Sequence, residues 1–169
     1  MPHRFHARHD AVARRYLYQI ARRRTAFAKA FVWWVKEPID LSRMRQAAGA
    51  FVGFKDFETF AESGGAGSAD KSTHVLVDRL DIEESGDLVL VGIEGSHFLW
   101  KMVRRIVGVL VEVGRGTLEP QAVTSLLESS SGEPARLTAP PSGLFLERVY
   151  YKGDARGAPI APATPIRQR

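Results

Sequence analysis

The feature that most constrains the fold is the apolar periodicity of residues His97–Val113. Apolar side chains recur there at steps of three and four residues, which places them on one face of an α-helix: Leu99, Met102, Val103, Ile106, Leu110 and Val113. The opposite face carries mostly polar residues: His97, Lys101, Arg104, Arg105, Gly108 and Glu112. Gly114 and Gly116 favour an end to the helix directly afterwards. We therefore predict one amphipathic helix that packs on a core through a single face.

Alternating segments on both sides of this helix predict strands that could supply that core. In Arg14–Ile20, Tyr16, Tyr18 and Ile20 share one face, while Arg15 and Leu17 share the other. Further strands are expected at His74–Ile82 and Asp87–Ile93, joined as a hairpin about Glu83–Gly86, and at Leu144–Tyr151. Ala26–Val35 is expected to be a second strand or an extended linker, and Gly64–Asp70 a flexible loop. Two more helices are expected, one after the N-cap Asp40 and ending at Gly53, the other after Pro120.

Hairpin-type strand order with few helices predicts an α+β fold, in which an antiparallel sheet has helices packed on one face. The length of 169 residues allows one domain with a real core. We expect that domain at residues 1–151. The remainder, 152–169, is rich in Pro, Ala and Arg and is expected to be a disordered basic tail.

Positive charge gathers near the N-terminus. The chain has a net charge of +5, and residues 1–36 hold nine lysines and arginines against the single acidic residue Asp10. A second basic cluster comprises Lys101, Arg104 and Arg105. Such clustering favours a polyanionic partner such as nucleic acid, although a solvated basic surface gives the same pattern. There is no cysteine, which excludes disulfides and thiolate metal sites, and no apolar stretch approaches a membrane span.

Two weaker patterns do not predict sites. His3, His6 and His9 are spaced three apart, but Arg4 and Arg8 between them would repel a metal cation, so we expect no metal. The sequence Asp70-Lys71-Ser72 follows a glycine-rich stretch, as in a phosphate-binding loop. The aspartate stands where that loop needs glycine and would repel a phosphate.

Three motifs together carry a family resemblance. The most specific is Phe98–Gly108, which fits the pattern F-x-x-x-M-V-R-x-I-V-G; it is accompanied by Phe5–Arg8 followed by Ala13–Tyr18, and by Gly53–Phe60. With the ending Gly143–Leu146, the chain from Phe5 to Tyr151 resembles the C-terminal half of the tRNA pseudouridine synthase A family. In the second motif Lys55 stands where the family usually has histidine.

The resemblance implies an isomerase that detaches uracil from its ribose in the anticodon arm of tRNA and rejoins it through carbon. It implies no cofactor, a homodimeric full-length form and a cytoplasmic location. Tyr16 matches the tyrosine that packs against the target base, and Arg104 the residue that pairs with the catalytic aspartate. The neighbouring basic residues Arg14, Arg15, Lys101 and Arg105 are expected to bind the RNA.

The sequence departs from the family pattern in one decisive respect. The nucleophilic aspartate belongs to an R-T-D-x-G-V-H-A motif, which these 169 residues lack, and neither Asp10 nor Asp56 has a similar setting. We therefore expect the chain alone to be inactive, as a truncated gene product, an isolated domain or one half of a split enzyme whose partner is a missing N-terminal half. A non-catalytic RNA-binding module and a basic structural protein remain the alternatives.

Overall fold

The computed structural model describes residues 5–24, 26, 28–62 and 72–164. Its centre is a six-stranded sheet in the order β2-β1-β5-β4-β3, with β6 also pairing with β1. The strands are β1 (Ala13–Ala21), β2 (Trp33–Trp34), β3 (Gly53–Asp56), β4 (His74–Ser85), β5 (Leu88–Gly95) and β6 (Leu144–Tyr150). All the pairings are antiparallel except that of β1 with β2, where Ile20 lies beside Trp33.

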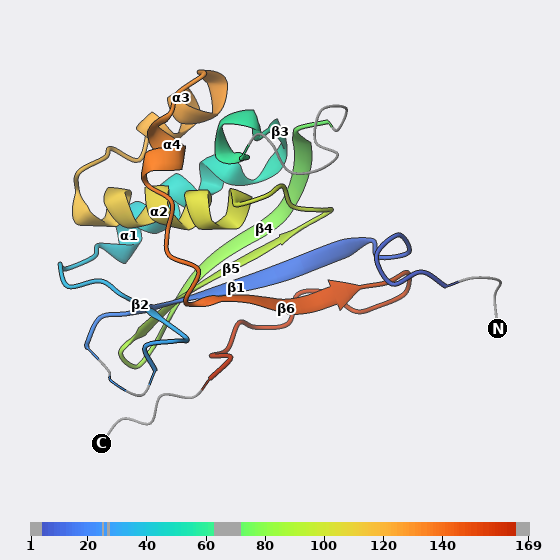
Figure 1. Ribbon diagram of the computed structural model, residues 1–169, viewed down its shortest axis with the longest axis horizontal. Coiled ribbons are helices and arrows are strands. Elements are labelled where there is room, and N and C mark those ends of the chain that lie inside the picture. Colours follow the sequence, from blue (N-terminus) through green and yellow to red (C-terminus); the bar gives the residue numbers. More distant parts are fainter. Residues whose placement is uncertain (1–4, 25, 27, 63–71, 165–169) are drawn as a thin grey trace.

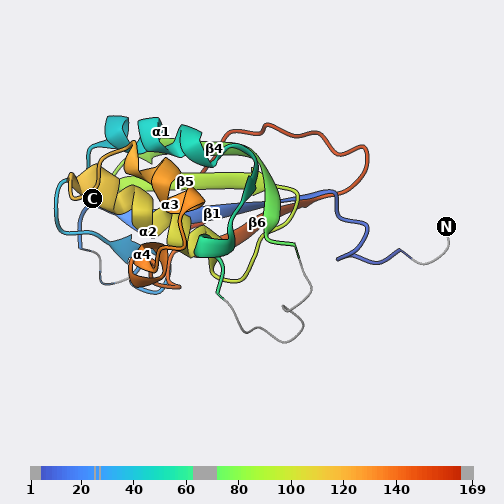
Figure 2. The same ribbon diagram turned by 90° about the horizontal axis from the view of Figure 1, so that it is seen from above.

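The helices lie on one face of this sheet, as expected for the α+β class (Figure 1). They are α1 (Leu41–Ala48), α2 (Met102–Arg115), α3 (Ala122–Glu128) and α4 (Glu133–Arg136), with 3₁₀ turns at Gly49–Phe51 and Glu58–Phe60. Seen from above, they cover one end of the sheet, and β1 and β6 extend beyond them (Figure 2). Within the described residues no helix is long and apolar enough to cross a membrane.

The α2 helix confirms the predicted apolar face, because Ile106, Leu110 and Val113 are fully buried against the sheet. The helix begins at Met102, later than the predicted His97, since Lys101 before it has a left-handed backbone with φ of 61°. The opposite face of α2, which the periodicity predicts to be polar and exposed, is partly buried. Arg105 and Gly108 are buried there, because the chain at Thr59–Ala61 covers Arg105 and the chain after α4 covers Gly108.

The other helices and strands are of the types that the sequence predicts, but some of them begin or end at other residues. Asp40 caps α1 by accepting hydrogen bonds from the backbone N–H groups of Ser42 and Arg43. The β4–β5 hairpin turns at Gly86 and Asp87, so its strands are longer than expected. Of the segment Ala26–Val35, only Trp33–Trp34 is a strand. The predicted Gly64–Asp70 loop lies outside the described residues.

The face of the sheet away from the helices carries a second, smaller apolar cluster around Leu17, Val32 and Leu90. Residues 152–164 have no helix or strand, yet they lie against this face rather than apart from it. Ile160 packs on the cluster, and the Arg15 guanidinium donates to the Ala158 carbonyl at 2.6 Å. Further contacts join Gln19 to Ala163 and Thr164, and Arg156 to Asp78. The contacts of residues 152–164 are mainly polar, and the predicted disorder of 152–169 stays a prediction.

Candidate active site

A pocket of about 330 Å³ opens at the start of α2. Three parts of the chain form it: the middle of β1, the turn that leads into α2, and the extended segment before β6. The lining residues are Tyr16, Phe98, Leu99, Trp100, Lys101, Met102, Val103, Arg104, Pro141 and Leu144. The pocket therefore joins three of the predicted site residues, Tyr16, Lys101 and Arg104, which are up to 88 positions apart in sequence.

Tyr16 reaches the pocket because alternation along β1 directs it to the helix side of the sheet. Its ring meets the Phe98 ring edge to face, with centroids 5.1 Å apart and an angle of 80° between the planes. This geometry is favourable for two aromatic rings and fixes the orientation of Tyr16. Phe98 is thus a supporting residue to which the sequence assigned no role, although it begins the most specific motif.

Arg104 is held by the segment that follows α4. Its Nε donates to the Ala139 carbonyl at 2.6 Å, and the Ala139 N–H donates to the Arg104 carbonyl at 3.0 Å. The next residue, Pro140, accepts a hydrogen bond from the buried Tyr18 hydroxyl at 2.7 Å. Burial raises the pKa of Tyr18, although the positive charge of Arg104 opposes the rise, so Tyr18 stays protonated and remains a donor.

The terminal nitrogens of Arg104 have no protein partner in the part of the chain that the structure describes. Its Nε makes the one side-chain hydrogen bond found there, and none of the ion pairs among those residues includes it. A guanidinium keeps its charge and can bind a carboxylate through two parallel hydrogen bonds. The pocket therefore offers a positioned cation that is available to an acidic group.

Lys101 is less available, because its Nζ lies 2.7 Å from Glu62 Oε1. The same hydrogen bond is the main reason that the pKa of the Glu62 carboxyl is lowered. The Glu62 N–H donates in turn to the Trp100 carbonyl at 3.0 Å. These two contacts tie the turn before α2 to the 3₁₀ turn that ends at Phe60, and they explain how Lys101 is held in its left-handed conformation.

The other predicted RNA-binding arginines do not line the pocket. Arg14 donates to backbone carbonyls, including that of Ser96 at 2.8 Å. Arg15 lies on the opposite face of the sheet, where it is buried and forms an ion pair with Glu147 at 3.0 Å. Arg105 is buried beneath the pocket and donates to the carbonyls of Thr59 and Ala61, and burial lowers its pKa. The binding roles of these three stay predictions.

Among the residues that the structure describes, no acidic one lines the pocket. Asp10 accepts from the His6 N–H at 2.6 Å in an exposed turn before β1. Asp56 accepts from the Glu58 N–H at 3.0 Å at the end of β3, where a hydrogen bond from Thr73 is the main cause of its lowered pKa. Both carboxylates thus have backbone partners of their own and lie away from Arg104.

Comparison with known proteins identifies the family. A model of the tRNA pseudouridine synthase family matches residues 47–152. Curated proteins named tRNA pseudouridine synthase A, from Syntrophotalea carbinolica and Geobacter sulfurreducens, are 43% and 39% identical over 153 and 149 residues. The chain belongs to the tRNA pseudouridine synthase A family. A relative of the same name from Pseudomonas aeruginosa is 40% identical over 157 residues.

These alignments cover 87–91% of the chain but only 54–60% of the relatives. The chain thus spans about 60% of the length of the first two tRNA pseudouridine synthase A relatives that it matches. Two of the three motifs that carry the resemblance contribute to the pocket, through Tyr16 and Phe98–Arg104. The third, Gly53–Phe60, supports it from below, since the Thr59 carbonyl anchors Arg105 one residue along α2 from Arg104.

Proposed function

We propose that this chain is the C-terminal half of a tRNA pseudouridine synthase that isomerises uridine in the anticodon arm of tRNA. The observation that carries the proposal is the pocket that joins Tyr16 to Arg104 while offering Arg104 no carboxylate. In this proposal the nucleophilic aspartate comes from a segment outside these 169 residues and enters the pocket beside Arg104. RNA binding, a cytoplasmic location and a homodimeric full-length form belong to the same proposal.

The reaction breaks the bond between N1 of uracil and C1′ of ribose and forms a bond from C5 to C1′. C5 loses a proton and N1 gains one, so the product is an isomer and no cofactor is required. A base in a stem or a stacked loop must first be flipped out, and it then needs an aromatic surface to replace the lost stacking. Tyr16 supplies that surface in the pocket, and the edge-to-face contact with Phe98 fixes the orientation of its ring.

Arg104 acts on the incoming carboxylate. A carboxylate is a nucleophile only when it is ionised, and a neighbouring guanidinium favours the ionised form. Because Ala139 fixes Nε at 2.6 Å, the two terminal nitrogens have a defined direction in which to hold the carboxylate oxygens. The protein thereby orients the nucleophile before the RNA arrives.

A second candidate function is a non-catalytic RNA-binding module that has kept basic residues and lost the chemistry. It is favoured by the same observation, that no acidic residue lines the pocket among those the structure describes. The two functions differ in one outcome. The half-enzyme gains activity when the missing part is supplied, whereas the binding module does not.

The test uses an unmodified tRNA anticodon stem-loop and nucleoside mass spectrometry to detect pseudouridine. We expect none from the chain alone and product when the N-terminal part of the Syntrophotalea carbinolica relative is added or fused. In the active combination, Arg104→Ala should lower the rate by about 10²- to 10³-fold, as when one electrostatic stabiliser is removed. Tyr16→Leu should lower it strongly, and Tyr16→Phe less, because the ring remains.

Arg136→Ala is the matched control, since it removes an exposed arginine on α4 whose one ion-pair partner among the described residues is Glu133. Product from the chain alone would disprove the external nucleophile and make Asp10 and Asp56 the residues to mutate. Equal rates for Arg104→Ala and the control would disprove the role of Arg104.

A further inference from the structure

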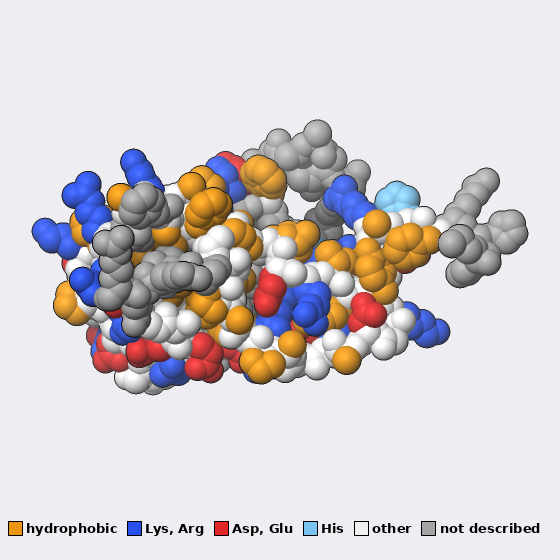
Figure 3. All heavy atoms as spheres, turned by 90° about the horizontal axis from the view of Figure 1, so that it is seen from below, with side chains coloured by type: hydrophobic (Ala, Val, Ile, Leu, Met, Phe, Trp, Pro, Cys, Tyr) orange, Lys and Arg blue, Asp and Glu red, His pale blue; other side chains and the backbone are white. Residues whose placement is uncertain are grey.

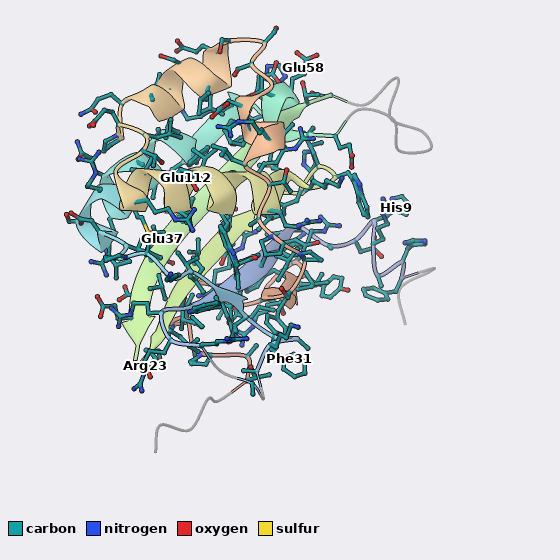
Figure 4. All side chains as sticks on the ribbon, turned by 60° about the vertical axis from the view of Figure 1, so that its left-hand side comes forward. His9, Arg23, Phe31, Glu37, Glu58 and Glu112 are labelled. Carbon is teal, nitrogen blue, oxygen red and sulfur yellow. The ribbon has the colours of Figure 1, made fainter. Side chains whose placement is uncertain are left out.

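The end of the sheet away from the pocket carries a second basic surface. It lies where β1 ends and the chain turns toward β2 and α1, and we call it the β1–β2 basic surface: Arg23, Arg24, Lys29, Phe31, Trp34 and Lys36. All six side chains are exposed. Seen from below the sheet, Lys and Arg side chains gather on one side of this end of the molecule, and Asp and Glu side chains lie along the other side (Figure 3). Figure 4 shows Arg23 and Phe31 at the lower end of the molecule in that view.

Most of the positive charge on this surface is uncompensated. Arg23 has a distant partner, Asp87 at 3.6 Å, and its side chain is still 80% exposed. Arg24, Lys29 and Lys36 form no ion pair with any residue that the structure describes. The nearest acidic residue in sequence, Glu37, is itself paired with Arg115 at 2.7 Å. A polyanion approaching this end would therefore meet cations with little internal competition.

Two aromatic side chains accompany these cations. Trp34 on the edge strand β2 is 42% exposed, and Phe31 is 44% exposed. The Arg24 guanidinium lies over the Trp34 ring at 5.6 Å from its centroid, which holds the ring in place on the surface. The neighbouring Trp33 points the other way and packs on Tyr18 in the core. Exposed rings among unpaired cations are the arrangement that binds nucleic acid, through stacking and phosphate contacts together.

We propose that the β1–β2 basic surface is a second RNA-binding surface, which contacts the phosphate backbone of the substrate beyond the nucleotide held in the pocket. The identity of that RNA as tRNA rests on the proposed function, whereas RNA binding at this surface does not. Tyr16 lies five residues before Ala21, where β1 ends, which is about 16 Å at 3.3 Å per residue, and Arg23 follows two residues later. The two sites are therefore too far apart to hold one nucleotide and close enough to hold one folded RNA.

The chemistry of the surface predicts how binding responds to salt. Each phosphate neutralised by a lysine or arginine contributes roughly 0.7 to 0.9 to the slope of log affinity against log salt. Loss of the four cations should therefore reduce that slope by about 3. Loss of the Trp34 ring should weaken binding by about fivefold or more without changing the slope, because stacking releases no counterions.

The experiment measures binding of the 169-residue chain to an unmodified full-length tRNA transcript by fluorescence anisotropy, between 50 and 300 mM KCl. One variant carries Arg23→Gln, Arg24→Gln, Lys29→Gln and Lys36→Gln. Its control removes the same charge elsewhere, with Lys55→Gln, Arg136→Gln, Arg148→Gln and Lys152→Gln. We expect the first variant to bind at least tenfold more weakly than the control at 150 mM KCl, with the lower slope. Trp34→Leu is the third variant.

Equal weakening in the two fourfold variants would overturn the proposal, because net charge alone would then explain binding. Unchanged affinity in the first variant would overturn it as well and would leave the surface to an acidic protein partner. Circular dichroism of each variant shows that it is folded. Binding is measured without turnover, so a failure to form pseudouridine in the combined enzyme would contradict the proposed function and leave this result intact.

Discussion

Gly108 controls how closely the chain after α4 approaches α2. A Cβ atom placed on Gly108 would lie 1.7 Å from the Leu137 carbonyl oxygen and 2.8 Å from its carbonyl carbon. Cβ contacts below 3.0 Å are essentially never seen, so the distance to the oxygen would have to open from 1.7 Å to about 3.0 Å. The atoms in the way are backbone atoms, which cannot move aside as the end of a flexible side chain can. We therefore expect Gly108→Ala to displace residues 137–139 from the helix.

That displacement reaches the candidate active site. Ala139 accepts the Arg104 Nε hydrogen bond at 2.6 Å, and a shift of more than 1 Å would break it. Overpacking costs about 1–3 kcal/mol, and a hydrogen bond to a charged group contributes about 1.5–3 kcal/mol. We expect Gly108→Ala to lower the free energy of unfolding by about 3 kcal/mol. With a slope of about 2 kcal/mol per molar urea, the urea midpoint would fall by about 1.5 M.

Gly49→Ala is the control for this measurement. Its Cβ would meet nothing within 4 Å, and its φ of −57° suits any residue. It should stabilise the chain by about 0.4–1 kcal/mol, because alanine restricts the unfolded state. If urea unfolding followed by circular dichroism places Gly108→Ala within about 0.5 kcal/mol of the wild type, the close approach of residue 137 does not position Arg104.

Three further predictions concern other parts of the chain. Ending the chain after Tyr151 should lower the free energy of unfolding in urea by about 2 kcal/mol through lost hydrogen bonds and burial, whereas ending it after Thr164 keeps every described contact and should change little. The pKa of Asp40 is lowered from 3.8, chiefly by the Ser42 hydroxyl, so its stabilising contribution is present above pH 3.8 and is lost as the pH falls through the lower folded value. The urea midpoint of Asp40→Asn, which keeps the cap, should therefore fall less between pH 5 and pH 2.5 than that of the wild type. Lys101→Ala should be about 1 kcal/mol less stable than Lys101→Gly in thermal unfolding. Both variants lose the Glu62 contact, and only glycine adopts a left-handed backbone freely. Equal stabilities would show that this backbone conformation carries no strain.

The sequence predicts best where the signal is local. The buried face of α2 follows from spacing alone, and the Asp40 cap follows from one residue type at one position. The burial of Arg105 and Gly108 could not be predicted in that way. Their partners lie 29 to 46 residues away, so the spacing of polar residues alone makes that side of the helix look solvent-exposed. The same limit applies to Gln19, which is fully buried and bonded to residues 144 and 145 positions along the chain.

The candidate site divides in a similar way. Periodicity placed Tyr16 and Arg104 on their elements, but only the family resemblance connected them, because nothing local relates β1 to the start of α2. The resemblance alone assigned the pairing role to Arg104 and RNA binding to Arg105, because the two residues are adjacent and chemically identical. The structure separates them by their partners, since Arg105 donates to buried carbonyls while Arg104 keeps its terminal nitrogens for the pocket.

The position of β1 has a consequence for synthesis on the ribosome. It is made before β5 and β6, which are its main neighbours. The side-chain partners of the buried Arg15 lie at residues 147 and 158, and two of the three partners of the Gln19 side chain lie at residues 163 and 164. Contacts of such long sequence separation form slowly, and they cannot form before the late segment has left the exit tunnel. Until then β2 can pair only with Ile20 and Ala21, so most of both edges of β1 stays unpaired, and exposed strand edges promote aggregation. We expect nascent chains of this protein to need a holding chaperone until residues 147–164 have left the exit tunnel.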